Sequence, residues 1–396
     1  MPSVQTVLYT TYTIVSIPAR LVAILLYYIP QSTRPHPKWT YHQAVGTKVF
    51  SLWWRYATAV NFHTRKTLLP GSEGDRFIVI PPPSDASTST NPTIYRDILL
   101  SNDQIQPLPV GAVWYTAPSV PQPSLSTPPA RLAIHFHGGA YVLGGARQME
   151  SGWGPEVLST ALSCPVLQPQ YRLSVAENAS FPAALQDAIT VYAYALNVLR
   201  VPADQIILSG ESAGGNLVLA VLRYLNNAAA SSGAPPLPLP RAALLWSPWV
   251  DLSRAAEDKA SSHPRRGMDY LFGELVAWGR ERFIPEGWED EHKQPQSQSQ
   301  NQANPTLPSD KFAYISPLRN EFYSPTPVFV QTGTAEILYE DHVQFDRGME
   351  EQGTKVEMLE IVNAPHDTFG AGLLVGFAKE AEDAARRAAR FVDEAV

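Results

Sequence analysis

The segment most able to do chemistry is Ser209-Gly210-Glu211-Ser212-Ala213-Gly214-Gly215-Asn216. A serine with glycine two residues before and two residues after it, set between an apolar run (205–208) and a helix-like run (217–222), has the sequence form of a nucleophile elbow. The glycines allow a tight turn that lifts the hydroxyl off the sheet edge. A phosphate-binding loop is the alternative, but neither a following Lys-Ser/Thr pair nor G-x-G-x-x-G spacing is present.

A serine hydroxyl is a weak nucleophile until a base accepts its proton. In this arrangement the expected order along the chain is serine, acid, histidine. Of the nine histidines, only His366 follows both the serine motif and the last expected strand, so we predict it as the base rather than as a solvated loop residue. His342 falls in the middle of an expected helix, and we predict that it lies on the surface.

The acid that orients the histidine is expected at the end of a strand, about thirty residues earlier. Glu336 follows the strand and turn 328–335 and is the predicted acid. Asp341 is the rival, although its position five residues later puts it inside the next helix. Asp367 adjoins the base and is poorly placed to orient it.

The negative charge that develops on an ester oxygen must be held by backbone N–H groups already in position. Ala213, the residue after the nucleophile, is expected to supply one. The glycine-rich segment 135–145 follows another strand, and we predict Gly138 and Gly139 as further donors. We expect His137 to brace this loop rather than to transfer protons.

The remaining chain supplies elements that can position these groups. Apolar runs predict strands at 131–137, 166–171, 206–208, 241–250, 326–332 and 356–362, and helical periodicity predicts helices at 182–199, 213–230 and 376–395. The alternation predicts an α/β fold with a mostly parallel central sheet and helices on both faces. Functional residues then belong at the carboxyl ends of the strands.

Residues 252–312 interrupt this rhythm and are predicted to form an inserted cap, with a helical piece near 270–283 and a surface excursion at 289–310. We therefore expect three parts: a membrane-anchor or membrane-associated helix at 1–30, a lead-in or cap region at 31–130, and a catalytic domain at 131–396 that contains the insert. The net charge of −7, without a basic block, argues against nucleic-acid binding. We expect no cofactor, because we find no metal cluster or nucleotide loop, and Cys164 is predicted to be a buried structural thiol.

Residues 4–29 are almost uncharged, with Arg20 as their single charge, and are long enough to cross a bilayer. Three interpretations stay open: a spanning anchor, a helix that lies on the membrane, or a helix that caps the site. We expect association with an endomembrane such as the endoplasmic reticulum. Arg34 and Lys38 follow the segment, and these two positive charges favour an orientation with the catalytic domain in the cytosol.

Several motifs in residues 130–375 together resemble the hormone-sensitive-lipase-like branch of the α/β-hydrolases. They are His137-Gly138-Gly139-Ala140, Tyr171-Arg172-Leu173 with Glu177 and Phe181-Pro182-Ala183-Ala184, Gly210 to Asn216, Ser247-Pro248-Trp249 with Asp251, Ile315-Ser316-Pro317-Leu318, Ala335-Glu336-Ile337-Leu338 and His366-Asp367-Thr368-Phe369. The resemblance implies an α/β-hydrolase fold and a carboxylic ester hydrolase that works through an acyl-serine. Glu336 stands where many relatives carry aspartate. The first hundred residues look more like fungal membrane-associated members, which include sterol-ester deacetylases and hydrolases of small-molecule biosynthesis.

We therefore predict a serine esterase or deacetylase acting on a lipophilic small-molecule ester. One alternative uses the same residues for acyl transfer, cyclisation or condensation in natural-product assembly. A second alternative, a non-catalytic ligand receptor on the same fold, would require a degraded set of catalytic residues. The oligomeric state and the acyl and alcohol groups cannot be read from the sequence.

Overall fold

The computed structural model describes residues 4–64, 66–83, 94–231, 237–288 and 309–395. Within these ranges the chain forms one eight-stranded sheet in the order β1-β2-β4-β3-β5-β6-β7-β8. The strands are β1 (Phe77–Ile80), β2 (Val110–Tyr115), β3 (Leu132–Phe136), β4 (Val166–Gln170), β5 (Ile206–Glu211), β6 (Ala242–Trp246), β7 (Val328–Gly333) and β8 (Val356–Ile361). Strand β2 is antiparallel to both neighbours, and all pairings from β4 to β8 are parallel. The predicted fold class is confirmed.

The parallel strands end together at one edge of the sheet. Glu211 at the end of β5 pairs with Trp246 of β6, which in turn pairs with Gln331 of β7. The loops that follow these strands therefore start at the same level, and side chains far apart in the sequence are brought together there.

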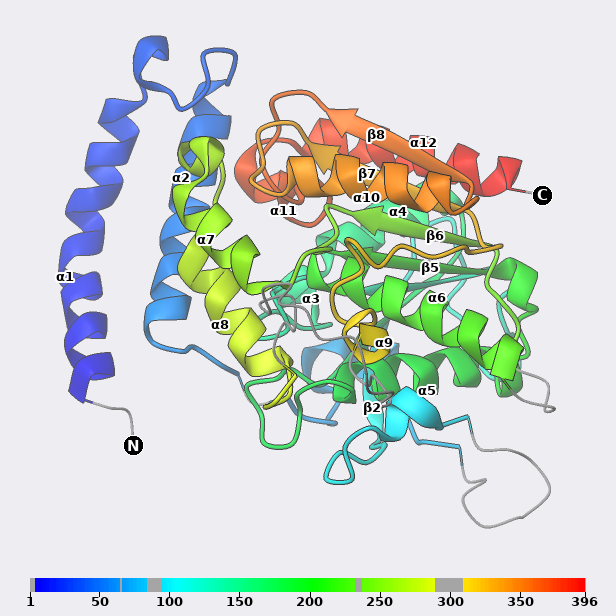
Figure 1. Ribbon diagram of the computed structural model, residues 1–396. Helices are drawn as coiled ribbons and strands as arrows, with labels where there is room; N and C mark the ends of the chain where they lie inside the picture. Colours follow the sequence, from blue (N-terminus) through cyan, green and yellow to red (C-terminus); the bar gives the residue numbers. More distant parts are fainter. Residues whose placement is uncertain (1–3, 65, 84–93, 232–236, 289–308, 396) are drawn as a thin grey trace.

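Helices cover both faces of the sheet (Figure 1). One face carries α5 (Ala183–Asn197), α6 (Ala213–Ser231) and α10 (Tyr339–Glu351), and the other carries α4 (Trp153–Leu162) and α12 (Ala378–Glu394). Helix α11 (Thr368–Val375) connects β8 to α12 and contacts α4. The apolar side of α12 is buried: Ala381, Ala384, Ala388 and Phe391.

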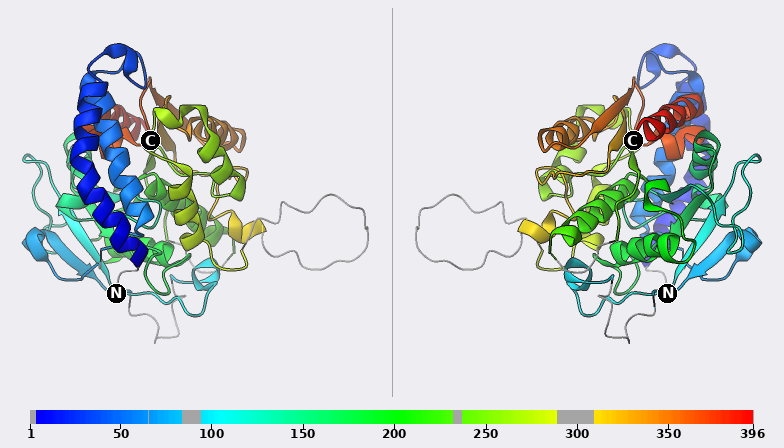
Figure 2. Two further views of the ribbon diagram at one scale, coloured as in Figure 1. Left: turned by 90° about the vertical axis from the view of Figure 1, so that its left-hand side faces the viewer. Right: turned by 90° about the vertical axis from the view of Figure 1, so that its right-hand side faces the viewer.

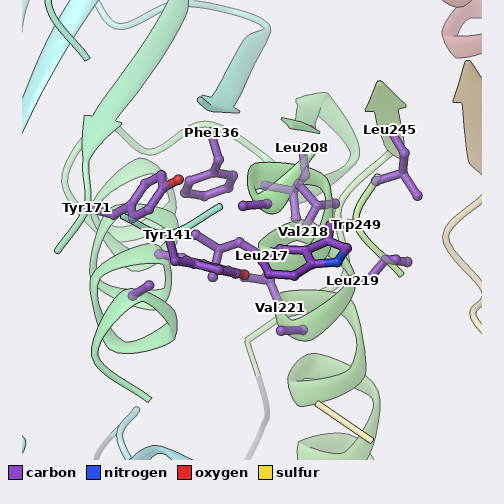
Figure 3. Packing of buried hydrophobic residues seen from close by; sticks show 14 of the residues in the cluster. Phe136, Tyr141, Tyr171, Leu208, Leu217, Val218, Leu219, Val221, Leu245 and Trp249 are labelled. Carbon is purple, nitrogen blue, oxygen red and sulfur yellow. The ribbon is translucent and has the colours of Figure 1, made fainter. Parts of the chain in front are cut away.

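The core beneath the site is made by strand and helix side chains in direct contact. Figure 3 shows Phe136, Leu208 and Leu245 from three neighbouring strands beside Leu217 and Val218 of α6, all of them buried. Burial of such side chains contributes about 1.5–3 kcal/mol each before conformational entropy is subtracted. This packing fixes the start of α6, and thus the turn that precedes it, against the sheet.

The sheet begins earlier in the chain than predicted. Strands β1 and β2 come from the region expected to be a lead-in or cap, 31–130. Every residue of β2 is buried, so its sequence, Val-Gly-Ala-Val-Trp-Tyr, lacks the alternation that marks a half-exposed strand. Prolines lie on both sides of β2, and proline is typical of connecting segments rather than of strands.

Two segments lie over the carboxyl edge of the sheet. The insert contributes α7 (Arg254–Ser262) and α8 (Gly273–Phe283), which pack against each other. The N-terminal region contributes α2 (Tyr41–Ala59), which contacts α8 and α11. The excursion predicted at 289–310 lies almost entirely outside the described residues.

Helix α1 (Val4–Tyr27) forms a hairpin with α2 and is the outermost element of the fold (Figures 1 and 2). Helix α2 is fixed to the catalytic part of the chain, since the Trp39 Nε1–H donates to the Asn363 carbonyl at 2.6 Å. Gly46 lies so close to α11 that a Cβ there would be 2.4 Å from the Leu374 carbonyl oxygen.

Candidate active site

Ser212 occupies the turn between β5 and α6, where its φ of 49° lies in the left-handed region. The flanking glycines are required by close backbone contacts: a Cβ on Gly210 would lie 2.2 Å from the Gly214 carbonyl oxygen. A Cβ on Gly214 would lie 2.0 Å from the carbonyl oxygen of Phe136, at the end of the neighbouring strand. The spacing of the motif is thus a steric requirement of a strand-to-helix turn packed on β3.

His366 follows β8 and lines the same cavity as Ser212. Its Nδ1 lies 2.6 Å from Glu336 Oε2, and its buried Nε2 has no hydrogen-bond partner among the described residues. Burial alone would lower the pKa of His366, but the hydrogen bond and the charge of Glu336 outweigh it and raise that pKa. The structure therefore brings the predicted base and acid into contact and leaves the second ring nitrogen free on the side of the cavity.

Glu336 is completely buried, yet its carboxylate is fully supplied with donors. Its Oε1 accepts hydrogen bonds from the Ser247 hydroxyl (3.0 Å), the Thr332 hydroxyl (2.6 Å) and the Gly333 N–H (2.7 Å). Burial opposes ionisation, but His342 and His366 hold the pKa of Glu336 well below its usual range. Asp341, the rival acid, is bound instead to Lys259 at 2.6 Å.

His342 does not lie on the surface, as its helical position suggested; it is completely buried behind Glu336. Its Nδ1 lies 2.8 Å from the Thr332 hydroxyl oxygen and its Nε2 lies 2.7 Å from the Pro248 carbonyl oxygen. The hydroxyl proton of Thr332 goes to Glu336, and the Pro248 carbonyl can only accept. Both ring nitrogens of His342 must then donate, so this ring is a positively charged partner of Glu336, with Nδ1 3.5 Å from Oε1. The surface prediction failed because α10 buries one side against the sheet.

Asp269, which the sequence did not single out, connects the insert to the loops that carry Glu336 and His366. Its Oδ2 accepts the Ile337 N–H at 2.8 Å, and its Oδ1 accepts the His366 N–H at 3.2 Å. Burial and the nearby Glu336 raise the pKa of Asp269 to about 6, although the charge of His366 opposes this. A residue of the cap region thus positions the backbone of the predicted acid and base. No local pattern predicts such a contact between segments almost 100 residues apart.

A second buried pair lies beneath the nucleophile. His135 Nε2 is 3.0 Å from Glu211 Oε1, and both side chains are buried. Burial lowers the pKa of His135 to about 3 and raises that of Glu211 to about 7. Burial, and secondly the charge of Glu211, likewise hold the pKa of Asp367 well above its usual value. Asp367 caps α11 by accepting the Gly370 N–H at 3.0 Å, so it does not orient His366.

The glycine-rich loop after β3 approaches the nucleophile closely, because a Cβ on Gly138 would be 3.4 Å from the Ser212 Cβ. The Gly138 N–H makes a long hydrogen bond, 3.4 Å, to Glu211 Oε2. The N–H groups of Gly139 and Ala213 donate to no residue in the described part of the chain. His137 braces the loop by stacking on Tyr171, with ring centroids 4.3 Å apart, and by contacting its neighbour's carbonyl oxygen.

A cavity of about 480 Å³ opens above Ser212 and His366. Its walls are mainly apolar and come from both covering segments: Phe50, Trp53 and Trp54 of α2, and Leu271, Leu275 and Val276 of the insert. This volume is typical of a site for a small molecule. Among the residues that the structure describes, no group of three or more His, Cys, Asp or Glu side chains is arranged to hold a metal ion.

Residues 133–370 match the family model of the α/β-hydrolase fold. The chain is 28% identical over 230 residues to an acetyl-hydrolase of Streptomyces hygroscopicus, covering 57% of this chain and 64% of that protein. It is 34% identical over 107 residues to human hormone-sensitive lipase, and these residues make up 26% of this chain and 9% of the lipase. A solved esterase/lipase from an uncultured bacterium shares the fold with a TM-score of 0.56 and 21% identity, covering 96% of this chain and 98% of that one.

The family match spans more than half of the chain, so the chain belongs to the α/β-hydrolase family. The similarity to hormone-sensitive lipase agrees with the branch of that family that the sequence motifs predict. The chain spans slightly less than two thirds of the length of the Streptomyces relative.

Proposed function

We propose that the chain is a serine carboxylic ester hydrolase that acts on a lipophilic small-molecule ester through an acyl-serine intermediate. One observation carries the proposal. His366 is bound to a buried, ionised Glu336 through Nδ1, and its Nε2 has no partner among the described residues; His366 itself lines the same cavity as the strained Ser212. The names of two relatives, acetyl-hydrolase and hormone-sensitive lipase, support the same class of reaction.

In the proposed reaction, Ser212 Oγ forms a bond to the ester carbonyl carbon while its proton passes to His366 Nε2. Glu336 stabilises the resulting imidazolium. The N–H groups of Gly139 and Ala213 hold the developing oxyanion, and the Gly138 N–H joins them if it leaves Glu211. Cleavage of the carbon–oxygen bond releases the alcohol with the proton from His366. Water then attacks the acyl-serine by the same steps, which releases the acid and restores Ser212.

The walls of the cavity support an apolar substrate. Aromatic and aliphatic side chains from α2 and the insert form most of the surface around the reacting groups. Transfer of an apolar acyl or alcohol group to this surface is favourable in proportion to the area removed from water. The described lining contains no lysine or arginine, so a carboxylate on either side of the ester would have no fixed cation of that kind to pair with.

The test is turnover of a panel of esters, from short to long acyl chains and including acetylated sterols and polyketides. We expect Ser212→Ala to abolish turnover, while the matched control Ser262→Ala, an exposed serine of α7, retains it. Unchanged turnover in Ser212→Ala would refute the assignment. Product analysis with and without an added alcohol separates hydrolysis from acyl transfer, and absence of turnover across the whole panel would favour a receptor.

A further inference from the structure

The hairpin of α1 and α2 has a surface that suits one occupant. We propose that this hairpin lies in the plane of an anionic lipid bilayer, with the outward face of α1 in the acyl region and the mouth of the cavity beside it. Entry of the substrate from the bilayer rests on the proposed esterase function, whereas membrane binding of the hairpin does not.

The outward face of α1 is apolar along its whole length. Its half-buried residues recur every three or four positions and face α2, as Tyr9 does against Tyr56. The opposite side exposes large apolar side chains at seven-residue steps: Leu8 is 65% exposed, Val15 75% and Val22 56%. The helix has an apolar span, Thr6–Tyr27, none of which is buried inside the protein. Soluble proteins rarely expose a continuous apolar surface of this extent.

Charge identifies the kind of surface that would cover this face. The first 72 residues hold seven lysines and arginines and no acidic residue. The other 324 residues hold the remaining 23 basic residues and all 37 acidic ones, which gives them a net charge of −14. A basic, apolar segment on an acidic domain is complementary to anionic phospholipids, whose headgroups attract lysine and arginine near the membrane surface.

Three of these cations lie close together on the hairpin. All three are exposed; partial burial lowers the pKa of Lys48, and so do the positive charges of Arg55 and Arg20. Among the described residues, no carboxylate forms an ion pair with any of the three. The guanidinium of Arg55 lies instead 4.3 Å from the ring centre of Phe272. A lipid phosphate would relieve this crowding of like charge.

Aromatic rings connect the exposed face of α1 to the cavity. Tyr12, Tyr9, Tyr56, Trp53 and Phe62 form a continuous series, with successive centroid distances of 6.3, 6.4, 6.1 and 5.2 Å. The last two rings line the cavity. Tyrosine and tryptophan favour the interface between headgroups and acyl chains. A lipophilic ester dissolved in the bilayer can therefore reach the cavity along apolar surface.

The packing of the hairpin favours a helix in the membrane plane over a spanning one. Helix α1 runs alongside α2 (Figure 2), and α2 is fixed to the catalytic part of the chain. If α1 crossed the bilayer in this arrangement, α2 would enter the hydrocarbon beside it, with Lys48 and Arg55. Charged side chains at that depth are strongly disfavoured. With α1 in the plane, the same side chains lie at headgroup depth.

The first test is flotation of the full chain with phosphatidylcholine vesicles, with and without phosphatidylserine. We expect binding to both, and tighter binding to the anionic vesicles. Arg20→Gln with Lys48→Gln should weaken anionic binding by roughly 25-fold, at about fivefold per cation, and leave binding to phosphatidylcholine intact. Arg200→Gln with Arg390→Gln, two exposed cations elsewhere, is the matched control. Absence of binding to either kind of vesicle overturns the proposal. This outcome includes a protein that dimerises in solution and buries the hairpin between its two copies.

The second test measures depth. Leu8→Cys, Val15→Cys and Val22→Cys, made one at a time, carry a fluorophore quenched by lipids brominated at known positions. The native Cys164 is buried, which raises its pKa to about 12, so it does not compete for label. An in-plane helix gives equal, shallow depth at all three positions. A spanning helix places Val15 about 10 Å deeper than the other two, since seven residues rise by about that distance; this result overturns the proposal.

The third test addresses the cavity separately. Replacing Leu8, Val15 and Val22 together by asparagine should leave turnover of a short water-soluble ester unchanged and reduce turnover of a long-chain ester embedded in vesicles by at least tenfold. Equal loss of both activities, or loss of neither, refutes entry from the bilayer. If the unaltered protein hydrolyses no ester, the esterase proposal fails, and the flotation and depth results still decide the membrane proposal.

Discussion

The buried His342 behind Glu336 gives the most informative mutation. Its Nδ1 lies 3.5 Å from Glu336 Oε1. With an effective dielectric constant of about 20, opposite unit charges at that distance attract each other by roughly 4–5 kcal/mol. His342→Leu removes the charge and leaves the Pro248 carbonyl without its donor. Glu336 and Pro248 are both buried, so water cannot replace the lost partner. We therefore expect a loss of roughly 3–5 kcal/mol in the free energy of unfolding, measured with urea.

Activity should change in a way that a purely structural role does not predict. The base must be neutral to act, so kcat/KM falls below the pKa of His366, which is raised in the folded protein. Removing the positive charge of His342 favours protonation of His366, so the acidic limb of the pH profile should move to higher pH. His342→Gln restores a donor without a charge; it should recover part of the stability and keep the shifted limb.

Val343→Ala, a change at the next and exposed position of α10, is the control for effects on the helix. A His342→Leu protein within about 0.5 kcal/mol of the unaltered chain, with an unmoved acidic limb, would show that His342 is neither charged nor coupled to the acid.

The remaining predictions concern other parts of the site. Asp269→Asn should lower kcat more than it raises KM, because the amide keeps one acceptor oxygen for two N–H groups, so the loop of Glu336 or the loop of His366 loses its acceptor; an unchanged kcat with an altered KM would contradict this role. The pKa of Glu211 is about 7 in the folded protein and about 4.3 for a free glutamate. Protonation of Glu211 therefore stabilises the fold fully below pH 4.3, and this contribution is lost as the pH rises to 7. Glu211→Gln should therefore raise the free energy of unfolding by roughly 3 kcal/mol at pH 8 but not at pH 4. An equal effect at both pH values would show that the pKa of Glu211 is not raised in the folded protein. Gly214→Ala would place a Cβ 2.0 Å from the Phe136 carbonyl oxygen, so we expect loss of soluble protein or of activity; an active, stable variant would contradict the steric account.

The sequence predicted the groups that local pattern fixes. Ser212 stands in a turn whose glycines are dictated by backbone contacts, and Glu336 and His366 each follow a buried strand of recognisable composition. The structure brings the acid and the base within 2.6 Å of each other. These positions were predictable because strand ends in a parallel sheet meet at one edge.

The surroundings of the pair were not predictable, because they depend on contacts between distant segments. Asp269 comes from an insert with no pattern of its own, and His342 is buried only because α10 packs against the sheet. Strand β2 is covered on both sides, so its sequence carries no period to detect. In each case, tertiary packing determines a role that residue spacing does not carry.

The central claim is that Ser212 forms a covalent acyl intermediate. The most direct measurement is intact mass after rapid acid quench of the protein mixed with a p-nitrophenyl ester, followed by peptide mapping. We expect one added acyl group on the peptide that contains Ser212, and none in Ser212→Ala. Turnover without an adduct, or an adduct on another residue, would contradict it.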